Sequence, residues 1–123
     1  MADKNISISG STVHGSVVAA ESIRDSFNVI EKSSIKVDLK ETLAQLTTAV
    51  EALARELPRE QAEEVADDLK VLAEQATKDK PNPKWYTVSI DGLIAAAQNL
   101  GKVGDAVITL SEKVRKILTG GLL

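Results

Sequence analysis

The chain has 123 residues, of which 43% are hydrophobic and only 2% aromatic; it has no cysteine, and its formal net charge is −3. This length fits one domain with a core of its own. The lack of cysteine excludes disulfides and thiolate chemistry, and the weakly acidic, mixed charge excludes a general nucleic-acid-binding protein.

The first residues, MADKNIS, lack the apolar core of a secretory signal peptide, and no run approaches the roughly 18 apolar residues of a membrane span. We therefore expect a cytoplasmic protein. The stretch GSTVHGS, residues 10–16, has two glycines spaced as in a phosphate-binding loop, but Ser16 stands where that motif requires lysine. We expect no cofactor.

Residues 1–36 are predicted to form two or three short β-strands in a hairpin or meander. In NISISGSTVHGSVVAAESIRDSFNVI, residues 5–30, apolar and small polar residues alternate between glycines that suit turns. So few strands are not stable alone, and their edges need cover. The third predicted helix offers one cover, and the same strands of sister subunits offer a better one. We expect this β-rich segment to drive homo-oligomerisation, with the interface residues Ile6, Ile8, Val13, Val17 and Ile23.

Residues 37–123 are predicted to form a three-helix bundle, so that the fold class is α+β. The first helix carries apolar residues at heptad spacing, and its seam contains Leu43, Leu46, Val50 and Leu53. Whether this coiled-coil-like seam closes within one chain or between chains stays open.

Prolines and glycines set the limits of the remaining predicted helices. Pro58 is placed to start the second helix, which ends before Pro81 and Pro83. The third helix is expected to begin near Ser89 and to continue almost to the last residues, interrupted only by Gly101 and Gly104.

Trp85 and Tyr86 lie together in PNPKWYTVS, residues 81–89. They fit a docking loop, since tryptophan and tyrosine are common anchors of protein interfaces. We favour the alternative that they plug the end of the bundle, because a core this poor in aromatic residues is expected to bury its large rings.

The stretch EEVADD, residues 63–68, places four carboxylates on one helix. A metal-binding bundle would need Glu-x-x-His ligands from further helices, which the chain does not contain. We expect no metal and a solvated acidic face, paired with basic side chains of the last helix: Lys102, Lys113, Arg115 or Lys116. No nucleophile–base set can be assembled, so we do not expect an enzyme.

The last predicted helix is amphipathic and has lysines near its end. The alternative function is therefore a membrane-associating or membrane-active small protein that uses residues 90–118. A sustained apolar seam is better explained by packing against protein, so we do not favour a membrane as partner.

Three stretches carry a resemblance to a known group of proteins: ISISGSTVHGSVVAAESIRDSFN (6–28), ALARELPREQAEEVADDLKVLAEQATKDKP (52–81) and NPKWYTVSIDGLIAAAQNLGKVG (82–104). Together they resemble small bacterial accessory modules found alone or at the ends of signalling and defence proteins with NTPase, caspase-like or TIR-type domains. The resemblance implies an assembly or docking module and brings no catalytic residues. The predicted function is thus a non-enzymatic homo-oligomerising adaptor, whose partners are itself and a larger effector.

Overall fold

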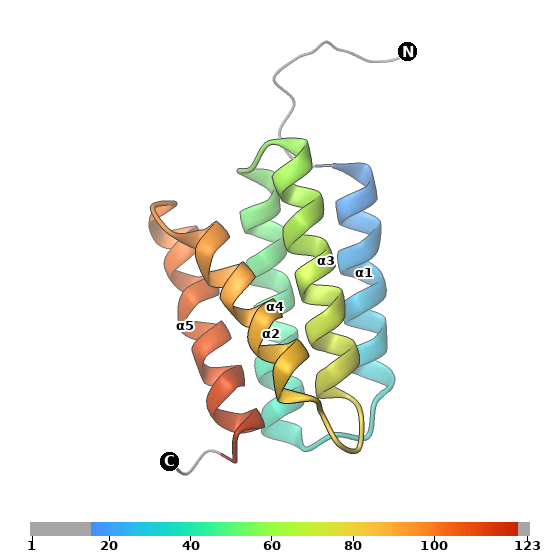
Figure 1. Ribbon diagram of the computed structural model, residues 1–123. Coiled ribbons are helices and arrows are strands. Elements are labelled where there is room, and N and C mark those ends of the chain that lie inside the picture. Colours follow the sequence, from blue (N-terminus) through green and yellow to red (C-terminus); the bar gives the residue numbers. More distant parts are fainter. Residues whose placement is uncertain (1–15, 121–123) are drawn as a thin grey trace.

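The computed structural model describes residues 16–120, which fold into five α-helices (Figure 1). They are α1 (Val17–Lys32), α2 (Val37–Arg55), α3 (Arg59–Ala76), α4 (Pro83–Ala97) and α5 (Gly101–Leu118). This part of the chain contains no strand. The fold is all-α, so the predicted α+β class, the β-strand pairing and the count of three helices are wrong.

The helices form one bundle around the central pair α2 and α3, which contact each other. Helix α1 packs against both of them on one side. On the other side α4 packs against α3, and α5 packs against α2 and α4 (Figure 1). Every helix therefore touches at least two others, and their apolar faces close over a shared core.

The core contains the predicted helical seam. Its four residues have no exposed surface and belong to one core cluster with buried residues of the other helices: Leu43, Leu46, Val50 and Leu53. The seam thus closes within one chain. Burial of each leucine contributes about 1.5–3 kcal/mol to folding, so this row holds the bundle together.

Residues 17–32 form a helix where strands were predicted. Ser16 caps the helix, because its Oγ accepts a hydrogen bond from the backbone N–H of Ala19 at 3.1 Å. The buried residues of α1 recur at the spacing 4, 3, 4, which is helical: Ala19, Ile23, Ser26 and Ile30. This face packs onto α2 and α3, so tertiary burial outweighs the strand preference of the valines and isoleucines.

The residues predicted for a β-mediated interface do not lie together on one surface. Ile23 lies in the core of its own chain, with 3% of its surface exposed, whereas Val17 is 78% exposed at the start of α1. Ile6, Ile8 and Val13 lie outside the described residues.

The long third helix of the prediction is two helices in the structure. It begins earlier than Ser89, because Pro83 occupies the first position of α4 and the Asn82 side chain caps it through the N–H of Lys84 at 3.0 Å. Proline cannot continue a helix but is well suited to begin one. Pro83, the second proline of the loop, therefore marks the start of α4.

The break between α4 and α5 depends on backbone that only a few residue types adopt. Asn99 and Gly101 have φ of 68° and 64°, in the left-handed region. A β-carbon on Gly104 would clash with the carbonyl oxygen of Ala97. These positions let α5 turn back and pack against α4.

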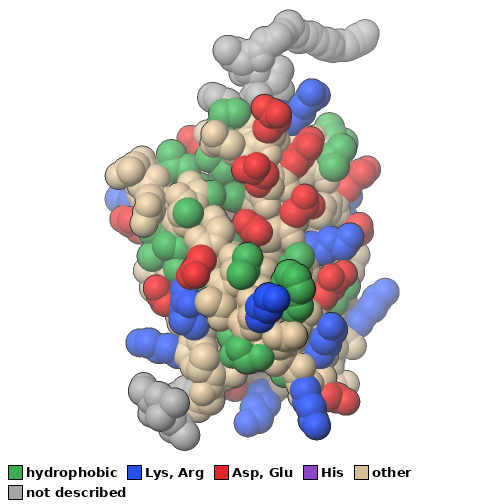
Figure 2. Space-filling view, viewed as in Figure 1, with side chains coloured by type: hydrophobic (Ala, Val, Ile, Leu, Met, Phe, Trp, Pro, Cys, Tyr) green, Lys and Arg blue, Asp and Glu red, His purple; other side chains and the backbone are tan. Residues whose placement is uncertain are grey.

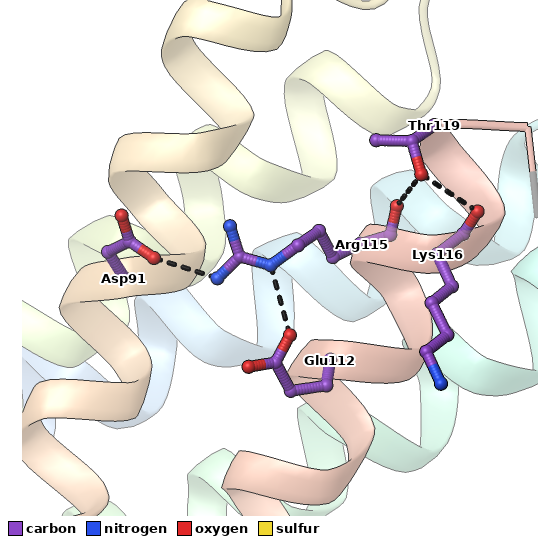
Figure 3. A network of polar contacts seen from close by, with 5 residues as sticks. All are labelled: Asp91, Glu112, Arg115, Lys116 and Thr119. Atoms are coloured by element: carbon purple, nitrogen blue, oxygen red, sulfur yellow. Dashed lines mark hydrogen bonds and ion pairs between the residues drawn. The ribbon is translucent and has the colours of Figure 1, made fainter. Parts of the chain in front are cut away.

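An ion-pair network holds α5 against α4 (Figure 3). The Arg115 guanidinium of α5 donates to Asp91 of α4 at 2.7 Å and to Glu112 of its own helix at 3.0 Å. The hydrogen bond to Asp91 is the main reason why the pKa of Arg115 is raised above its ordinary value. The network fixes the position of α4, which forms one wall of the site described next.

Candidate functional site

An open groove of about 800 Å³ lies between α3 and α4. Helix α3 contributes polar and acidic residues to it, and α4 contributes small ones. The lining residues are Leu57, Gln61, Glu64, Val65, Asp67, Asp68, Gly92, Ala95, Ala96, Gln98 and Leu100.

The groove combines a negative wall with apolar surface. Glu64, Asp67 and Asp68 supply three carboxyl groups from consecutive turns of α3. None of the arginines and lysines in residues 16–120 lines it. Figure 2 shows the same trend over the whole face, with acidic side chains gathered on its upper part and basic ones towards its lower end.

Asp68 is placed by its contact with Gly92. A β-carbon on Gly92 would clash with the Asp68 carboxyl group, so this carboxyl lies against the α4 backbone. The missing side chain at position 92 lets the two helices hold a half-buried acid between them. Any larger residue would push that acid out of the groove.

The pKa of Asp68 is raised from its usual value of 3.8 to about 6. Burial is the largest cause, and repulsion from Asp67 and then from Glu64 adds to it. Near neutral pH the group is ionised but destabilised. A cation placed in the groove would relieve this cost, because it favours the charged form.

The remaining carboxylate of the acidic stretch, Glu63, has a structural role. The Ser16 hydroxyl donates to its Oε2 at 2.7 Å, which ties the start of α1 to α3. The expected pairing of this face with basic residues of the last helix fails for Arg115, which binds Asp91 and Glu112 instead. Within residues 16–120, no ion pair joins Glu64, Asp67 or Asp68 to a lysine or arginine.

The two adjacent aromatic residues have separate environments. Tyr86 is buried in the core with 4% of its surface exposed, as the plug interpretation predicted. Trp85 is 48% exposed, and the Lys84 ammonium lies 5.4 Å from its ring centre. Trp85 is remote from the acidic groove, which is formed by the second half of α4.

Within residues 16–120, no group of three histidine, cysteine or carboxylate side chains could hold a metal ion. The same range has no helix with the length and apolar character needed to cross a bilayer. Val107 and Val114, on the apolar face of α5, are fully buried against the bundle. A membrane-bound α5 would first have to leave the core.

Comparisons of the chain with family models, with curated proteins and with solved structures find no match.

Proposed function

We propose that this protein is a non-enzymatic adaptor module whose α3–α4 groove binds a cationic, amphipathic segment of a partner protein. One observation carries the proposal: three carboxylates stand over apolar surface in an open groove that no lysine or arginine of the described part of the chain lines. Negative walls with apolar floors suit helices or loops that carry lysine or arginine beside apolar side chains.

Electrostatics favours a cationic occupant over the alternatives. The raised pKa of Asp68 means that its charge is poorly compensated in the free protein. Binding of an ammonium or guanidinium group next to Asp68 stabilises its carboxylate, and part of the binding free energy comes from this relief. Nucleic acids and anionic lipids would be repelled by the same wall.

An enzymatic role has weaker support. A raised carboxyl pKa in a groove is a common mark of a general acid. Its neighbours in this groove, however, are two carboxylates of the same helix, two glutamines and apolar residues. These residues provide no nucleophile and no basic group, so a docking function explains the lining better than catalysis does.

The sequence resemblance suggests where such a partner would be found. Accessory modules of this kind accompany larger signalling and defence effectors, and we propose that the cationic segment belongs to such an effector. The membrane-associating alternative draws no support from α5, whose apolar face is used inside the bundle.

The test is titration of a labelled amphipathic helical peptide of leucine and lysine against the full chain, followed by fluorescence anisotropy at two salt concentrations. The triple variant Glu64→Gln, Asp67→Asn, Asp68→Asn should lose at least tenfold in affinity. The control variant removes the same charge from exposed positions outside the groove: Glu31→Gln, Glu41→Gln, Glu74→Gln. Equal losses of affinity in both triple variants would show that binding depends only on net charge and would refute docking in the groove.

A second pair of variants tests the groove without any change of charge. Ala95→Trp places a large ring in the groove and should block the peptide. Ala106→Trp makes the same change at an exposed position of α5 outside the groove and should leave binding intact. Peptide affinity that survives Ala95→Trp would contradict docking at this site.

A further inference from the structure

A second groove lies between α1 and α2 and shares no lining residue with the acidic groove. It consists of two adjoining hollows of about 240 and 60 Å³, which have Ala20, Ile23 and Glu51 in common. The larger hollow lies beside Phe27, and its α2 wall is formed by Thr47 and Thr48.

Helix α1, one wall of this groove, carries more of the exposed large hydrophobic side chains than any other helix. Of the seven large hydrophobic side chains that are exposed within residues 16–120, four belong to α1: Val17, Val18, Phe27 and Val29. Phe27 is the single phenylalanine of the chain, yet 37% of its surface is exposed. Val18 and Val29 lie about half a turn round the helix from Phe27, so Phe27 is the large apolar side chain that this groove exposes.

The larger hollow has one charge of each sign on opposite walls, and the smaller hollow adds Arg55 of α2. Arg24 stands on α1 and Glu51 on α2, both exposed and both lining the larger hollow. Glu51 also lies 3.6 Å from Arg55, but both side chains are largely exposed, so that pair is weak. A surface with one charge of each sign on facing walls is complementary to a copy of itself.

We propose that the α1–α2 groove binds a second copy of this chain, related to the first by a two-fold axis that runs along the groove. Such an axis sets α1 of each copy over α2 of the other. Because Arg24 and Glu51 line the same hollow, their levels along the bundle are close, although Glu51 also borders Ala20 in the smaller hollow. Arg24 of each copy then faces Glu51 of the second copy, which gives two intermolecular ion pairs.

The same operation brings the aromatic side chains together. Phe27 of each copy meets the hollow beside Thr47 and Thr48 of the other, and the two rings lie next to each other at the axis. An aromatic pair of this kind adds to the burial of apolar area. The proposed self-association therefore uses a helical face and not the strands predicted from the sequence. It is independent of the docking proposed for the α3–α4 groove.

The first experiment is light scattering on the full chain from micromolar to submillimolar concentration. We expect a dimer, and a monomer after Phe27→Glu. Val88→Glu is the matched control, because Val88 is exposed on α4, away from the groove, and the dimer should persist. A wild-type monomer throughout, or a dimer that withstands Phe27→Glu, would overturn the proposal.

Charge exchange provides the sharper test. Arg24→Glu alone and Glu51→Arg alone should each dissociate the dimer, because like charges then face each other across the interface. An equimolar mixture of the two variants should form heterodimers, and the double variant should form homodimers again. Failure of the mixture to associate would contradict the two-fold arrangement, even if Phe27→Glu proves unable to fold.

Two further measurements distinguish this proposal from peptide docking in the α3–α4 groove and from the interface predicted from the sequence. Phe27→Glu should bind the leucine–lysine peptide as tightly as the parent chain, so failure of one proposal leaves the other standing. Deletion of residues 1–15 should leave the dimer intact. Loss of the dimer on that deletion would instead support the interface predicted from the sequence and overturn this one.

Discussion

The carboxyl group of Asp68 on α3 lies against the backbone of Gly92 on α4, in the space that a β-carbon at position 92 would occupy. This contact places an acid with a pKa of about 6 at the wall of the acidic groove. The stability of the bundle and the charge of its candidate binding site are therefore coupled through one side chain.

The first prediction concerns Asp68→Asn. The folded-state pKa is about 6, above the usual 3.8, so the folded protein binds more protons than the unfolded chain between these values. Stability consequently falls as pH rises from about 4 to 6 and stays lower above that window. Asp68→Asn removes this penalty and should raise the free energy of unfolding at pH 7.5 by about 1 kcal/mol, since the carboxyl is half in water and the full linkage value must be reduced.

Urea denaturation at pH 7.5 and at pH 3.5 measures this effect. The gain should nearly disappear at the lower pH, where Asp68 is mostly protonated in both the folded and the unfolded state. Asp67→Asn removes the same charge from an exposed neighbour and should give a smaller gain. An Asp68→Asn gain of equal size at both pH values would show that the charge of Asp68 is not its cause.

The second prediction compares two glycines. A β-carbon on Gly104 would meet the Ala97 carbonyl oxygen, which is backbone and cannot move aside, so Gly104→Ala should cost about 2 kcal/mol. A β-carbon on Gly92 would meet a carboxyl that can rotate towards solvent, and alanine favours the helix by about 1 kcal/mol. Gly92→Ala should therefore change stability little but lower the pKa of Asp68, which NMR titration would detect.

The third prediction separates the adjacent aromatic residues. Tyr86 is buried, and Tyr86→Ala should lower the free energy of unfolding by about 3 kcal/mol through the cavity that it leaves. Trp85 is half exposed, and Trp85→Ala should cost about 1 kcal/mol or less. Thermal unfolding followed by far-UV circular dichroism suits both variants; similar losses would show that Trp85 also plugs the bundle.

The fourth prediction concerns the link between α4 and α5. Arg115→Gln breaks the ion pairs with Asp91 and Glu112, and it should cost about 0.5–1 kcal/mol because Asp91 and Glu112 are largely exposed. The cost should shrink in molar salt, where such pairs are screened. Lys113→Gln removes the same charge from an exposed position of α5 and serves as control; a loss as large as that of Arg115→Gln would rule out the specific pairs as its source.

The fifth prediction concerns the pH dependence of peptide binding. Protonation of Asp68 below about pH 6 removes one of the three negative charges of the groove. The affinity for the leucine–lysine peptide should thus fall as the pH drops from 7.5 to 5. Asp68→Asn should flatten that part of the profile, and an unchanged slope in this variant would assign the titration to another group.

The heptad seam was predictable because it depends only on sequence spacing. Leu43, Leu46, Val50 and Leu53 recur every three or four residues, and all four are buried as expected. The start of α3 was equally local: Pro58 was expected to start this helix, and it is the N-cap of α3, which begins at Arg59. Such signals involve neighbours in the chain and need no knowledge of the final packing.

Residues 17–32 were misassigned because two patterns coexist in them. Their β-branched residues and short alternations favour strand, while Ala19, Ile23, Ser26 and Ile30 have helical spacing. The second pattern prevails because α2 and α3 offer a surface that fits a helix. A serine at the third buried position hid this signal, since Ser26 satisfies its hydroxyl locally through the carbonyl of Ser22 at 3.1 Å.

The candidate site was predictable only in its acidic half. The stretch EEVADD shows the carboxylates in the sequence. The opposite wall consists of Gly92, Ala95 and Ala96, and these residue types have no functional groups that would indicate a site. To predict that wall, one would have to know that α4 ends in a turn before α5. Asn99 followed by Gly101 is the local mark of that turn, since both residues tolerate positive φ.

The uneven distribution of charge over the bundle has a consequence for how partners arrive. Lysines cluster where α1, α3 and α5 end, and carboxylates cluster where α3 begins, so the molecule carries an electric dipole along its long axis. A positively charged protein that diffuses nearby is turned and steered towards the acidic end before any contact forms. Encounter rates should accordingly fall steeply with ionic strength, even where the final complex is held mainly by apolar contacts.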